Sequence, residues 1–514
     1  MVATSMAGIL HNAAADRPSR YDAPVAQVPK DSRAILQRIA RRVMLERGLQ
    51  PEFTGEALSQ LQSILGASAE RGPAIRDLRH LLWCSIDNDD SRDLDQLSVA
   101  EPMPADAARV WIAIADVDAL VARGSPIDDH ARGNTTSVYT AAEIFPMLPE
   151  RLSTDLTSLA DGQERLALVI EMIVDATGVI TTSDVYRGLV VNRAKLAYDS
   201  VAAWLDGHAS APVRITSVPG LDAALQLQDG IAQRLRRNRF ARGALGLQTE
   251  QSKAVFEGEL LLDLRPEHGN RAKELIEDFM IAANGVTARF LAQHGVPSLR
   301  RVLRAPERWD RIVALASGFG AALPATPDAG ALNAFLIGRR QSDPQRFADL
   351  SLSVVKLLGR GEYTLEMPDA PAMGHFALSV RDYTHSTAPN RRYPDLITLR
   401  LIKAALAGKD AAYTPSELGQ LAAHCTQQED NAARVERQVQ KSAAALLLSG
   451  RIGARFDGIV TGASDKGVWV RIDAPAVEGR IVAGERGADV GDRVQVQLLS
   501  TDVERGFIDF RKNG

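Results

Sequence analysis

The chain has 514 residues, of which 45% are hydrophobic and 24% charged, and its formal net charge is −4. This length and composition predict about three globular domains, and they exclude a collagen, a coiled-coil rod and a wholly disordered chain. No apolar stretch approaches the roughly 20 residues that a membrane-spanning helix needs, so we expect no membrane partner. Because acidic and basic side chains nearly balance, a polyanionic partner would have to bind in a local basic channel.

The N-terminus and the two cysteines predict the cellular location. Residues 1–24 contain no basic segment followed by an apolar one, so we expect no secretory signal. Cys84 and Cys425 are far apart and lack the paired spacing of a disulfide scaffold or of a structural zinc site. We therefore expect a cytoplasmic protein, in a reducing compartment.

The first domain, residues 1–80, is predicted to be a loose arm followed by a small helical module. Apolar residues at helical spacing predict helices over 34–46, with Ser32 as N-cap, and over 54–65. A short third helix is expected near 75–82. This order fits a helix-turn-helix-like module, and it fits a helical cap packed on the next domain equally well.

The second domain, residues 81–448, has no linker-like break and is predicted to be one large mixed α+β domain. Strands are expected at 110–115, 166–174 and 185–191. Helices are expected at 273–293, 395–406 and 430–448. The domain is too large for a simple sandwich or barrel.

The third domain, residues 449–514, is predicted to be a small β-barrel. Short alternating segments at 455–460, 468–472, 493–499 and 506–510 are separated by Gly or Asp turns. Short strands of this kind within about 65 residues are typical of a five-stranded OB-type barrel. The predicted fold class is therefore multidomain α+β, with a helical N-terminal module, a large mixed domain and a C-terminal five-stranded OB-fold barrel.

The densest acidic cluster lies between Ser85 and Gln96, between two apolar strand-like runs. Such a loop can direct several carboxylates at one point, which requires a cation to neutralise them. An EF-hand calcium loop is excluded, because Arg92 stands where that loop needs glycine and Ser98 where it needs glutamate. From the cluster alone, a solvated acidic turn is the more frequent outcome.

The order of residues in this cluster, Ser85-Ile86-Asp87 and then Arg92-Asp93-Leu94-Asp95, resembles the signature of the ribonuclease II / ribonuclease R family of processive exoribonucleases. The similarity continues in the family's order through segments 110–116, 146–149, 152–156, 194–199, 274–284 and 385–395. The C-terminal barrel is similar to the RNA-binding OB module that follows the catalytic domain in this family. The match covers about four fifths of the chain, which is far more specific than one motif.

The resemblance implies a hydrolase that degrades single-stranded RNA from its 3′ end and releases nucleoside 5′-monophosphates. It implies Mg²⁺, or Mn²⁺ in its place, as the cofactor. The implied metal ligands are Asp87, Asp93, Asp95 and Gln96. The implied catalytic residues are Asp93, Asp95 and Arg391. No protein partner is expected, and the chain is expected to act as a monomer.

The basic residues allow two interpretations. Arg391 and Arg392 lie in a proline-bounded loop before a predicted helix, which suits them to bind RNA phosphate. Without the resemblance, a structural ion pair would be the more frequent role of adjacent arginines. The most basic stretch, residues 234–242, fits an RNA contact and a solvated helix face equally well.

Three further residues are expected to contact RNA by resemblance. Tyr198 can stack on a base, although its spacing fits an interior tyrosine equally well. Glu436 resembles a glutamate near the family's site. His385 is expected to orient the loop that carries Arg391 and not to bind metal.

Two departures from the family keep other functions open. Gln96 stands where the family usually has the second of two adjacent aspartates, so we expect one metal position to be weaker. The N-terminal 80 residues cannot hold the family's two cold-shock barrels. One alternative is therefore a catalytically silent RNA-binding protein, and another is a DNA-binding regulator built on the N-terminal helices.

Overall fold

The computed structural model describes residues 29–248, 251–267, 269–344, 346–464, 467–472 and 474–513. The chain divides into two compact units. The large unit comprises Ala34–Lys253 and Arg265–Gln440, and the small unit comprises Met1–Arg33, Ala254–Leu264 and Lys441–Gly514. Residues 1–28 of the expected N-terminal arm lie outside the described residues.

The N-terminal segment contains two of the three expected helices. Helix α1, Ser32–Glu46, begins at Ser32 itself, and helix α2, Gly55–Ser63, is capped by Thr54, which accepts a hydrogen bond from the Ala57 amide. The predicted third helix is wrong, because Ile75–Asp77 forms strand β1. Its backbone pairs in parallel with strand β8, Ile180–Val191, and a short apolar run cannot reveal such a distant partner.

The two N-terminal helices pack on the large unit as a cap. Helix α2 lies beside helix α3, Pro126–Asn134, where the Ile127 amide donates to the Gln60 side chain at 2.9 Å. Just after α1, the Asn134 side chain exchanges two 2.8 Å hydrogen bonds with the backbone of Gln50. The sequence left open a helix-turn-helix-like module and a helical cap packed on the next domain, and the structure shows the second arrangement.

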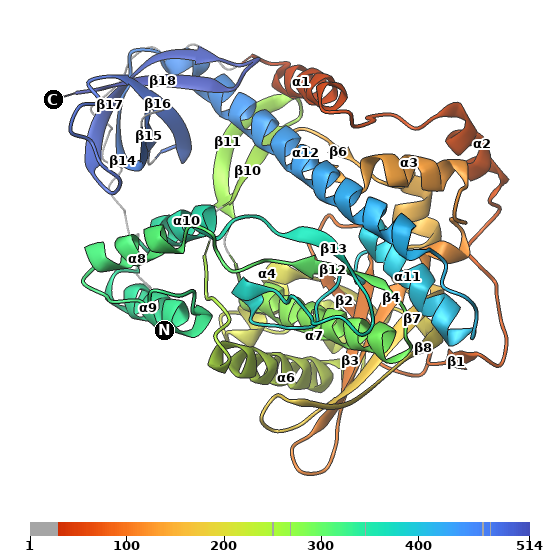
Figure 1. The fold of residues 1–514 in the computed structure, drawn as a ribbon. Helices are drawn as coiled ribbons and strands as arrows, with labels where there is room; N and C mark the ends of the chain where they lie inside the picture. Colours follow the sequence, from red (N-terminus) through yellow and green to blue (C-terminus); the bar gives the residue numbers. More distant parts are fainter. Residues whose placement is uncertain are drawn as a thin grey trace, which may run out of the picture. The chain divides into compact units, whose positions relative to one another are not determined.

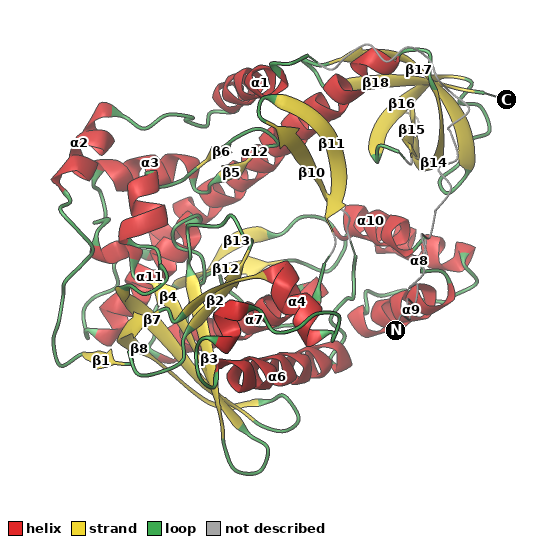
Figure 2. Ribbon diagram, turned by 180° about the vertical axis from the view of Figure 1, so that it is seen from behind, coloured by secondary structure: helices red, strands yellow, loops and turns green. Residues whose placement is uncertain are grey.

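A seven-stranded sheet in the order β1-β8-β7-β4-β3-β2-β9 forms the centre of the large unit (Figure 2). Its remaining strands are β2 (Cys84–Asp87), β3 (Gln96–Pro102), β4 (Ala108–Ala115), β7 (Glu164–Val174) and β9 (Ala194–Ala197). The expected strands at 110–115, 166–174 and 185–191 are confirmed. Strand β2 pairs with β3 antiparallel and with β9 parallel, so the acidic loop between β2 and β3 joins neighbouring strands.

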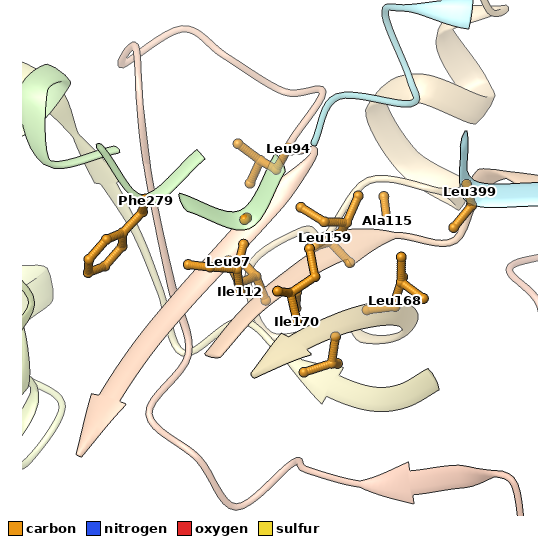
Figure 3. Packing of buried hydrophobic residues seen from close by; sticks show 14 of the residues in the cluster. Leu94, Leu97, Ile112, Ala115, Leu159, Leu168, Ile170, Phe279 and Leu399 are labelled. Carbon is orange, nitrogen blue, oxygen red and sulfur yellow. The ribbon is translucent and has the colours of Figure 1, made fainter. Parts of the chain in front are cut away.

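The core of the large unit packs against both faces of these central strands. Strand β4 is buried along nearly its whole length, as its continuous apolar sequence predicts. Figure 3 shows Leu97, Ile112 and Ile170 from three adjacent strands close to Leu94 and Leu159. Helices α6 (Leu221–Ala241) and α7 (Arg271–Gln293) lie side by side next to this sheet (Figure 1). The expected helix at 273–293 is thus confirmed.

The other elements of the large unit surround the sheet. Two helices follow the sheet strands, α4 (Tyr198–Leu205) and α5 (Val213–Thr216). Short antiparallel pairs are β5 (Val138–Tyr139) with β6 (Ile144–Phe145) and β12 (Ser298–Val302) with β13 (Glu362–Glu366). Helices α8 (Trp309–Gly318), α9 (Ala329–Ser342) and α10 (Phe347–Leu358) share a small apolar core of their own.

The last two long helices confirm the expected helices at 395–406 and 430–448. They are α11 (Tyr393–Leu406) and α12 (Pro415–Leu448). The hairpin of β10 (Gln251–Glu257) and β11 (Leu260–Glu267) was not expected. Within the described residues, no helix is both long enough and apolar enough to cross a membrane.

The C-terminal part of the small unit is a closed barrel in the order β14-β15-β16-β18-β17. Its strands are β14 (Arg455–Ser464), β15 (Gly467–Ile472), β16 (Val477–Ala483), β17 (Arg493–Asp502) and β18 (Phe507–Lys512). A Cβ on Gly479 would come within 2.5 Å of the buried Phe510 ring, so this position requires glycine. The five-stranded OB-type barrel is confirmed.

Candidate active site

The acidic loop begins at Asp87, the last residue of β2, and ends before Gln96, the first residue of β3. The Asp87 carboxylate accepts hydrogen bonds from the Asn88 amide at 2.7 Å and from the Ser91 hydroxyl at 2.9 Å. Asp87 thereby closes the first turn of the loop and keeps its second oxygen available to a ligand.

The second half of the loop is fixed by residues that directly follow the segment 152–156, which is one of the segments similar to the family. The Ser158 hydroxyl donates to the Arg92 carbonyl at 2.8 Å and accepts from the Leu94 amide at 3.0 Å. The Leu94 carbonyl accepts from the Leu159 amide, and the Asp95 carbonyl from the Ala115 amide. The backbone between Arg92 and Asp95 is therefore held on both sides.

Asp95 is the most buried carboxylate of the loop, with 2% of its surface exposed. Its Oδ1 accepts from the Asn390 amide at 2.9 Å, and its Oδ2 lies 3.3 Å from Nε of Arg391. Burial raises the pKa of Asp95 to about 7, although Arg391 and the Asn390 amide both act to lower it. The structure thus joins the acidic loop to the arginine-bearing loop, two segments far apart in sequence.

Asp93 and Asp87 add negative charge around the same point. Burial raises the pKa of Asp93, Arg391 lowers it, and Asp87 raises it further. Across the described ranges, no three His, Cys, Asp or Glu side chains already converge closely enough to hold a metal ion. The donor set of Asp87, Asp93 and Asp95 nevertheless suits a hard dication, since carboxylate oxygens are its preferred ligands and its charge would relieve their mutual repulsion.

Gln96 begins strand β3, where it pairs with Ile114, and Asp95 lies just before the strand, with its carbonyl accepting from the Ala115 amide. The Gln96 side chain is buried, with 8% of the residue exposed. Among the described contacts, no side-chain hydrogen bond joins Gln96 to the three aspartates. Gln96 as a metal ligand stays a prediction.

The two adjacent arginines occupy different environments. Arg391 keeps 43% of its side chain exposed beside Asp95, and its carbonyl accepts from the Ser137 amide at 2.9 Å. Arg392 forms two 2.8 Å hydrogen bonds with the buried carboxylate of Asp395. Arg391 can therefore meet a phosphate, whereas Arg392 is engaged in the structural ion pair that the sequence left open.

Tyr198 begins α4 directly after β9, whose last residue, Ala197, pairs with Asp87. The ring is partly buried, and Lys273 Nζ lies 5.9 Å from its centroid. Burial raises the pKa of Tyr198, Asp87 raises it further and Arg391 lowers it. Tyr198 therefore lies beside the acidic loop, where a base could stack on it.

Tyr139 lies beside Arg391 and was not predicted from the sequence. The residue is 41% exposed. Its hydroxyl interacts with the Arg391 guanidinium, and desolvation there raises its pKa to about 12. The Tyr139 amide donates to Glu436 Oε1 at 2.8 Å. Glu436 thus supports the backbone beside the site. The only sequence signal for Tyr139 was an aromatic residue in a polar stretch a few residues before the segment 146–149.

His385 lies in a pocket of tyrosines. Its Nδ1 is 2.7 Å from the Tyr363 hydroxyl, and its ring contacts the Tyr383 ring edge-on at 5.8 Å. Burial lowers the pKa of His385 well below its usual value, so the ring is neutral. Next to it, Asn284 of α7 accepts from the Ser386 amide and hydroxyl, both at 2.9 Å. These contacts orient the loop that leads to Arg391.

The basic stretch at 234–242 forms ion pairs between helices. Arg236 lies 2.6 Å from Glu274, and Arg239 lies 2.5 Å from Asp278, both acids being on α7. Burial raises the pKa of Asp278 to about 6, and Arg239 acts to lower it. These two arginines therefore join α6 to α7.

Comparisons with known proteins match the two main parts of the chain. Residues 75–408 match the RNB domain, and residues 454–513 match the RNase II-type exonuclease C-terminal S1 domain. Ribonuclease R of Aquifex aeolicus is 29% identical over 468 residues, which is 85% of this chain and 64% of that protein. Ribonuclease R of Escherichia coli is 28% identical over 505 residues, which is 90% of this chain and 60% of that protein. The chain thus spans less than two thirds of the length of these relatives.

Solved structures with the same fold include an RNA complex of one relative and a protein described as a pseudonuclease. Mycoplasma genitalium RNase R in complex with ribose-methylated single-stranded RNA has a TM-score of 0.84 at 23% identity, over 93% of this chain and 78% of that chain. Yeast Ssd1, described as a pseudonuclease, has a TM-score of 0.68 at 16% identity, over 90% of this chain and 57% of that chain. At these identities the likeness concerns the fold alone.

Proposed function

Because the chain belongs to the family of proteins that carry an RNB domain, we propose that it is a 3′-to-5′ exoribonuclease. Its substrate is single-stranded RNA, and its products are nucleoside 5′-monophosphates. The observation that carries this proposal is the meeting of the buried Asp95 carboxylate with the Asn390 amide and Arg391. A solvated acidic turn would not bury a carboxylate beside an arginine from a distant loop.

The residues that would hold Mg²⁺ or Mn²⁺ are Asp87, Asp93 and Asp95. Bound there, the ion would supply an activated water and charge stabilisation at the phosphoryl oxygens. The protein's own part is to keep Asp95 ready to lose its proton, since Arg391 and the Asn390 amide favour its ionised form. Arg391 adds a fixed positive charge at the point where a phosphate would enter.

The RNA end would be held by aromatic surfaces around Arg391. Tyr198 follows Ala197, which pairs with Asp87, and Tyr139 lies two residues after Ser137, whose amide donates to the Arg391 carbonyl. Both tyrosines therefore border the acidic loop or Arg391. Stacking on such rings accepts any base, as an enzyme that removes successive nucleotides requires. In the small unit, Phe507 of β18 is 57% exposed and offers a further stacking surface on a barrel of the S1 family.

The silent RNA-binding protein is the second candidate, since a pseudonuclease of this fold exists in yeast Ssd1. Here the buried Asp95 still meets Arg391, and Asp87 and Asp93 lie in the same loop, which favours a working nuclease. A DNA-binding regulator is less well supported, because the N-terminal helices pack against α3 and the β5–β6 hairpin. The two buried, unpaired cysteines agree with the proposed location in a reducing cytosol.

The proposal is tested with 5′-labelled single-stranded RNA and the full chain. In Mg²⁺ we expect a ladder of fragments that shortens from the 3′ end, and EDTA should stop it. A 3′-phosphorylated or duplex RNA of the same sequence provides the comparison for end recognition. RNA that stays intact while binding tightly would instead establish the silent protein.

A further inference from the structure

Helix α1 is docked firmly by one apolar stripe. Five of its residues recur at helical spacing and are each at most 4% exposed, namely Leu36, Ile39, Ala40, Val43 and Met44. The Gln50 backbone just beyond the helix exchanges two hydrogen bonds with Asn134 of α3. The helix is therefore a fixed element from which a polar side chain can act on its neighbours.

Arg41 extends from this helix to the β5–β6 hairpin. Its Nη1 and Nη2 lie 2.7 and 2.8 Å from the two oxygens of Glu143, which is a bidentate pair. Its Nε donates to Glu52 at 3.0 Å. The guanidinium also lies 5.5 Å from the ring centroid of Phe145, the second residue of β6. Arg41 thus holds the hairpin by its turn and by its returning strand.

The hairpin needs such support because its ladder is very short. Only Val138 with Phe145 and Tyr139 with Ile144 form strand pairs. The turn is closed by Thr140, whose amide donates to the Glu143 carbonyl and whose hydroxyl accepts from the Glu143 amide, both at 3.1 Å. Isolated hairpins are at best marginally stable even when longer, so external contacts decide where Tyr139 lies.

The first strand of the hairpin also borders the proposed active site. Just before it, the Ser137 amide donates to the Arg391 carbonyl at 2.9 Å, and within it the Tyr139 amide donates to Glu436 at 2.8 Å. These contacts place the Tyr139 hydroxyl where it interacts with the Arg391 guanidinium. Arg391 in turn lies 3.3 Å from Asp95. A series of contacts therefore runs from Arg41 to Glu143 and Thr140, and through the adjacent Tyr139 to Arg391 and Asp95.

We propose that Arg41 is a positioning residue for RNA hydrolysis, which holds the β5–β6 hairpin so that Tyr139 is correctly placed beside Arg391. This inference rests on the proposed function and gives the N-terminal helices a part in it. Arg41 itself contacts neither the acidic loop nor Arg391 among the described contacts. Its effect therefore passes through Tyr139.

A double-mutant cycle tests this route. Single-turnover cleavage of single-stranded RNA is measured for Arg41→Ala, Tyr139→Ala and the double variant. We expect Arg41→Ala to slow cleavage about 5- to 20-fold, because misplacing a reacting group by ~1 Å can cost on the order of 10²-fold. The double variant should be no slower than Tyr139→Ala alone. If the rate losses of the two single variants multiply in the double variant, Arg41 acts independently of Tyr139, and the inference is overturned.

The two acidic partners of Arg41 provide a matched control. Glu143→Gln removes the partner on the hairpin and should reproduce the loss of Arg41→Ala. Glu52→Gln removes the partner outside the hairpin, whose side chain is 66% exposed, and should leave the rate unchanged. The exchanged pair Arg41→Glu with Glu143→Arg should recover part of the rate. Equal losses from Glu52→Gln and Glu143→Gln would contradict the proposal.

A readout without catalysis separates this inference from the proposed function. With 3-fluorotyrosine at position 139, the ¹⁹F resonance reports the surroundings of the ring directly. We expect Arg41→Ala and Glu143→Gln to shift or broaden it, and Glu52→Gln to leave it unchanged. If the parent protein fails to cleave RNA, the proposed function falls while this spectrum still decides the positioning role. An unchanged resonance in Arg41→Ala would overturn the inference.

Discussion

Burial of a single carboxylate distinguishes this site from an ordinary acidic turn. The loop between β2 and β3 contains several acids, but Asp89 and Asp90 are exposed, whereas Asp95 is covered by the Asn390 segment. The sequence shows where these acids lie along the chain, and the resemblance implies a role for each. The sequence could not show which carboxylate is buried, because that burial depends on a loop almost three hundred residues later.

Replacing Asp95 tests the centre of the proposed site. Asp95→Asn keeps the acceptor for the Asn390 amide but removes the charge, so we expect cleavage to fall by a factor of at least about 10³ while RNA binding is retained or strengthened. Asp90→Asn, at a 79% exposed side chain of the same loop, is the control and should cleave normally. A rate for Asp95→Asn within about threefold of the parent would show that Asp95 is no ligand.

The raised pKa of Asp95 predicts how metal binding depends on pH. With a pKa of about 7, this carboxyl is protonated at pH 6 and ionised at pH 8 in the metal-free protein. Since a dication binds the ionised form, the Mg²⁺ concentration that gives half-maximal rate should fall as pH rises through 7. The folded protein holds this proton more tightly than the unfolded chain, so the stability it contributes is present at low pH and lost as pH rises through 7. Mg²⁺ should therefore raise the Tm more at pH 8 than at pH 6, and equal shifts would contradict this assignment.

The position of Gln96 changes what its substitution should do. The sequence alone favoured a weakened metal position, which Gln96→Asp would restore. Because Gln96 is 8% exposed and no described hydrogen bond joins its side chain to the aspartates, we expect the new carboxylate to be buried without a partner. The variant should show a lower Tm and an unchanged Mg²⁺ requirement. A clear fall in that requirement would show that the side chain reaches the metal.

At the scale of elements, long periodic segments were predictable and short ones were not. The apolar repeats of α7, α11 and strands β4, β7 and β8 extend over enough residues to identify their period. Strand β1 has three residues and depends on β8 for its hydrogen bonds. The β5–β6 hairpin has two-residue strands with no period at all, and Tyr139 was missed with it.

The start of α11 depends on one buried ion pair. Asp395 is fully buried, accepts from the Ala388 amide at 2.8 Å and binds Arg392 through both oxygens. Breaking such a pair leaves an uncompensated charge, so Arg392→Ala should destabilise the fold by about 3–5 kcal/mol. Arg392→Lys should lose less stability, because the positive charge beside Asp395 is kept. Thermal unfolding and RNA binding measured on the same variants check this prediction. A variant with a normal Tm and weakened RNA binding would show that Arg392 contacts RNA and is not needed for stability.

At the scale of the whole molecule, the residues of the proposed chemistry lie in the large unit and the barrel lies in the small unit. This separation predicts that binding and hydrolysis can be altered independently. Phe507→Ala should weaken the binding of long RNA about fivefold, as expected for one lost base stack, and leave the single-turnover rate on short RNA unchanged. Filter binding and rapid-quench assays on both lengths measure the two effects. A fivefold fall in the single-turnover rate on short RNA would contradict the separation of binding from hydrolysis.

The order in which the site residues occur along the chain has a consequence during synthesis. The aspartates of the acidic loop leave the ribosome early, and Arg391 and Glu436 leave it late. At about 5–20 residues per second, the interval between Asp95 and Arg391 lasts on the order of 15 to 60 seconds. Throughout that interval the proposed site lacks Arg391 and the Asn390 amide, so the growing chain would carry an incomplete site beside the message that encodes it. A product terminated before Arg391 should therefore leave RNA intact, and the proposed activity should arise only when nearly the whole large unit has been made.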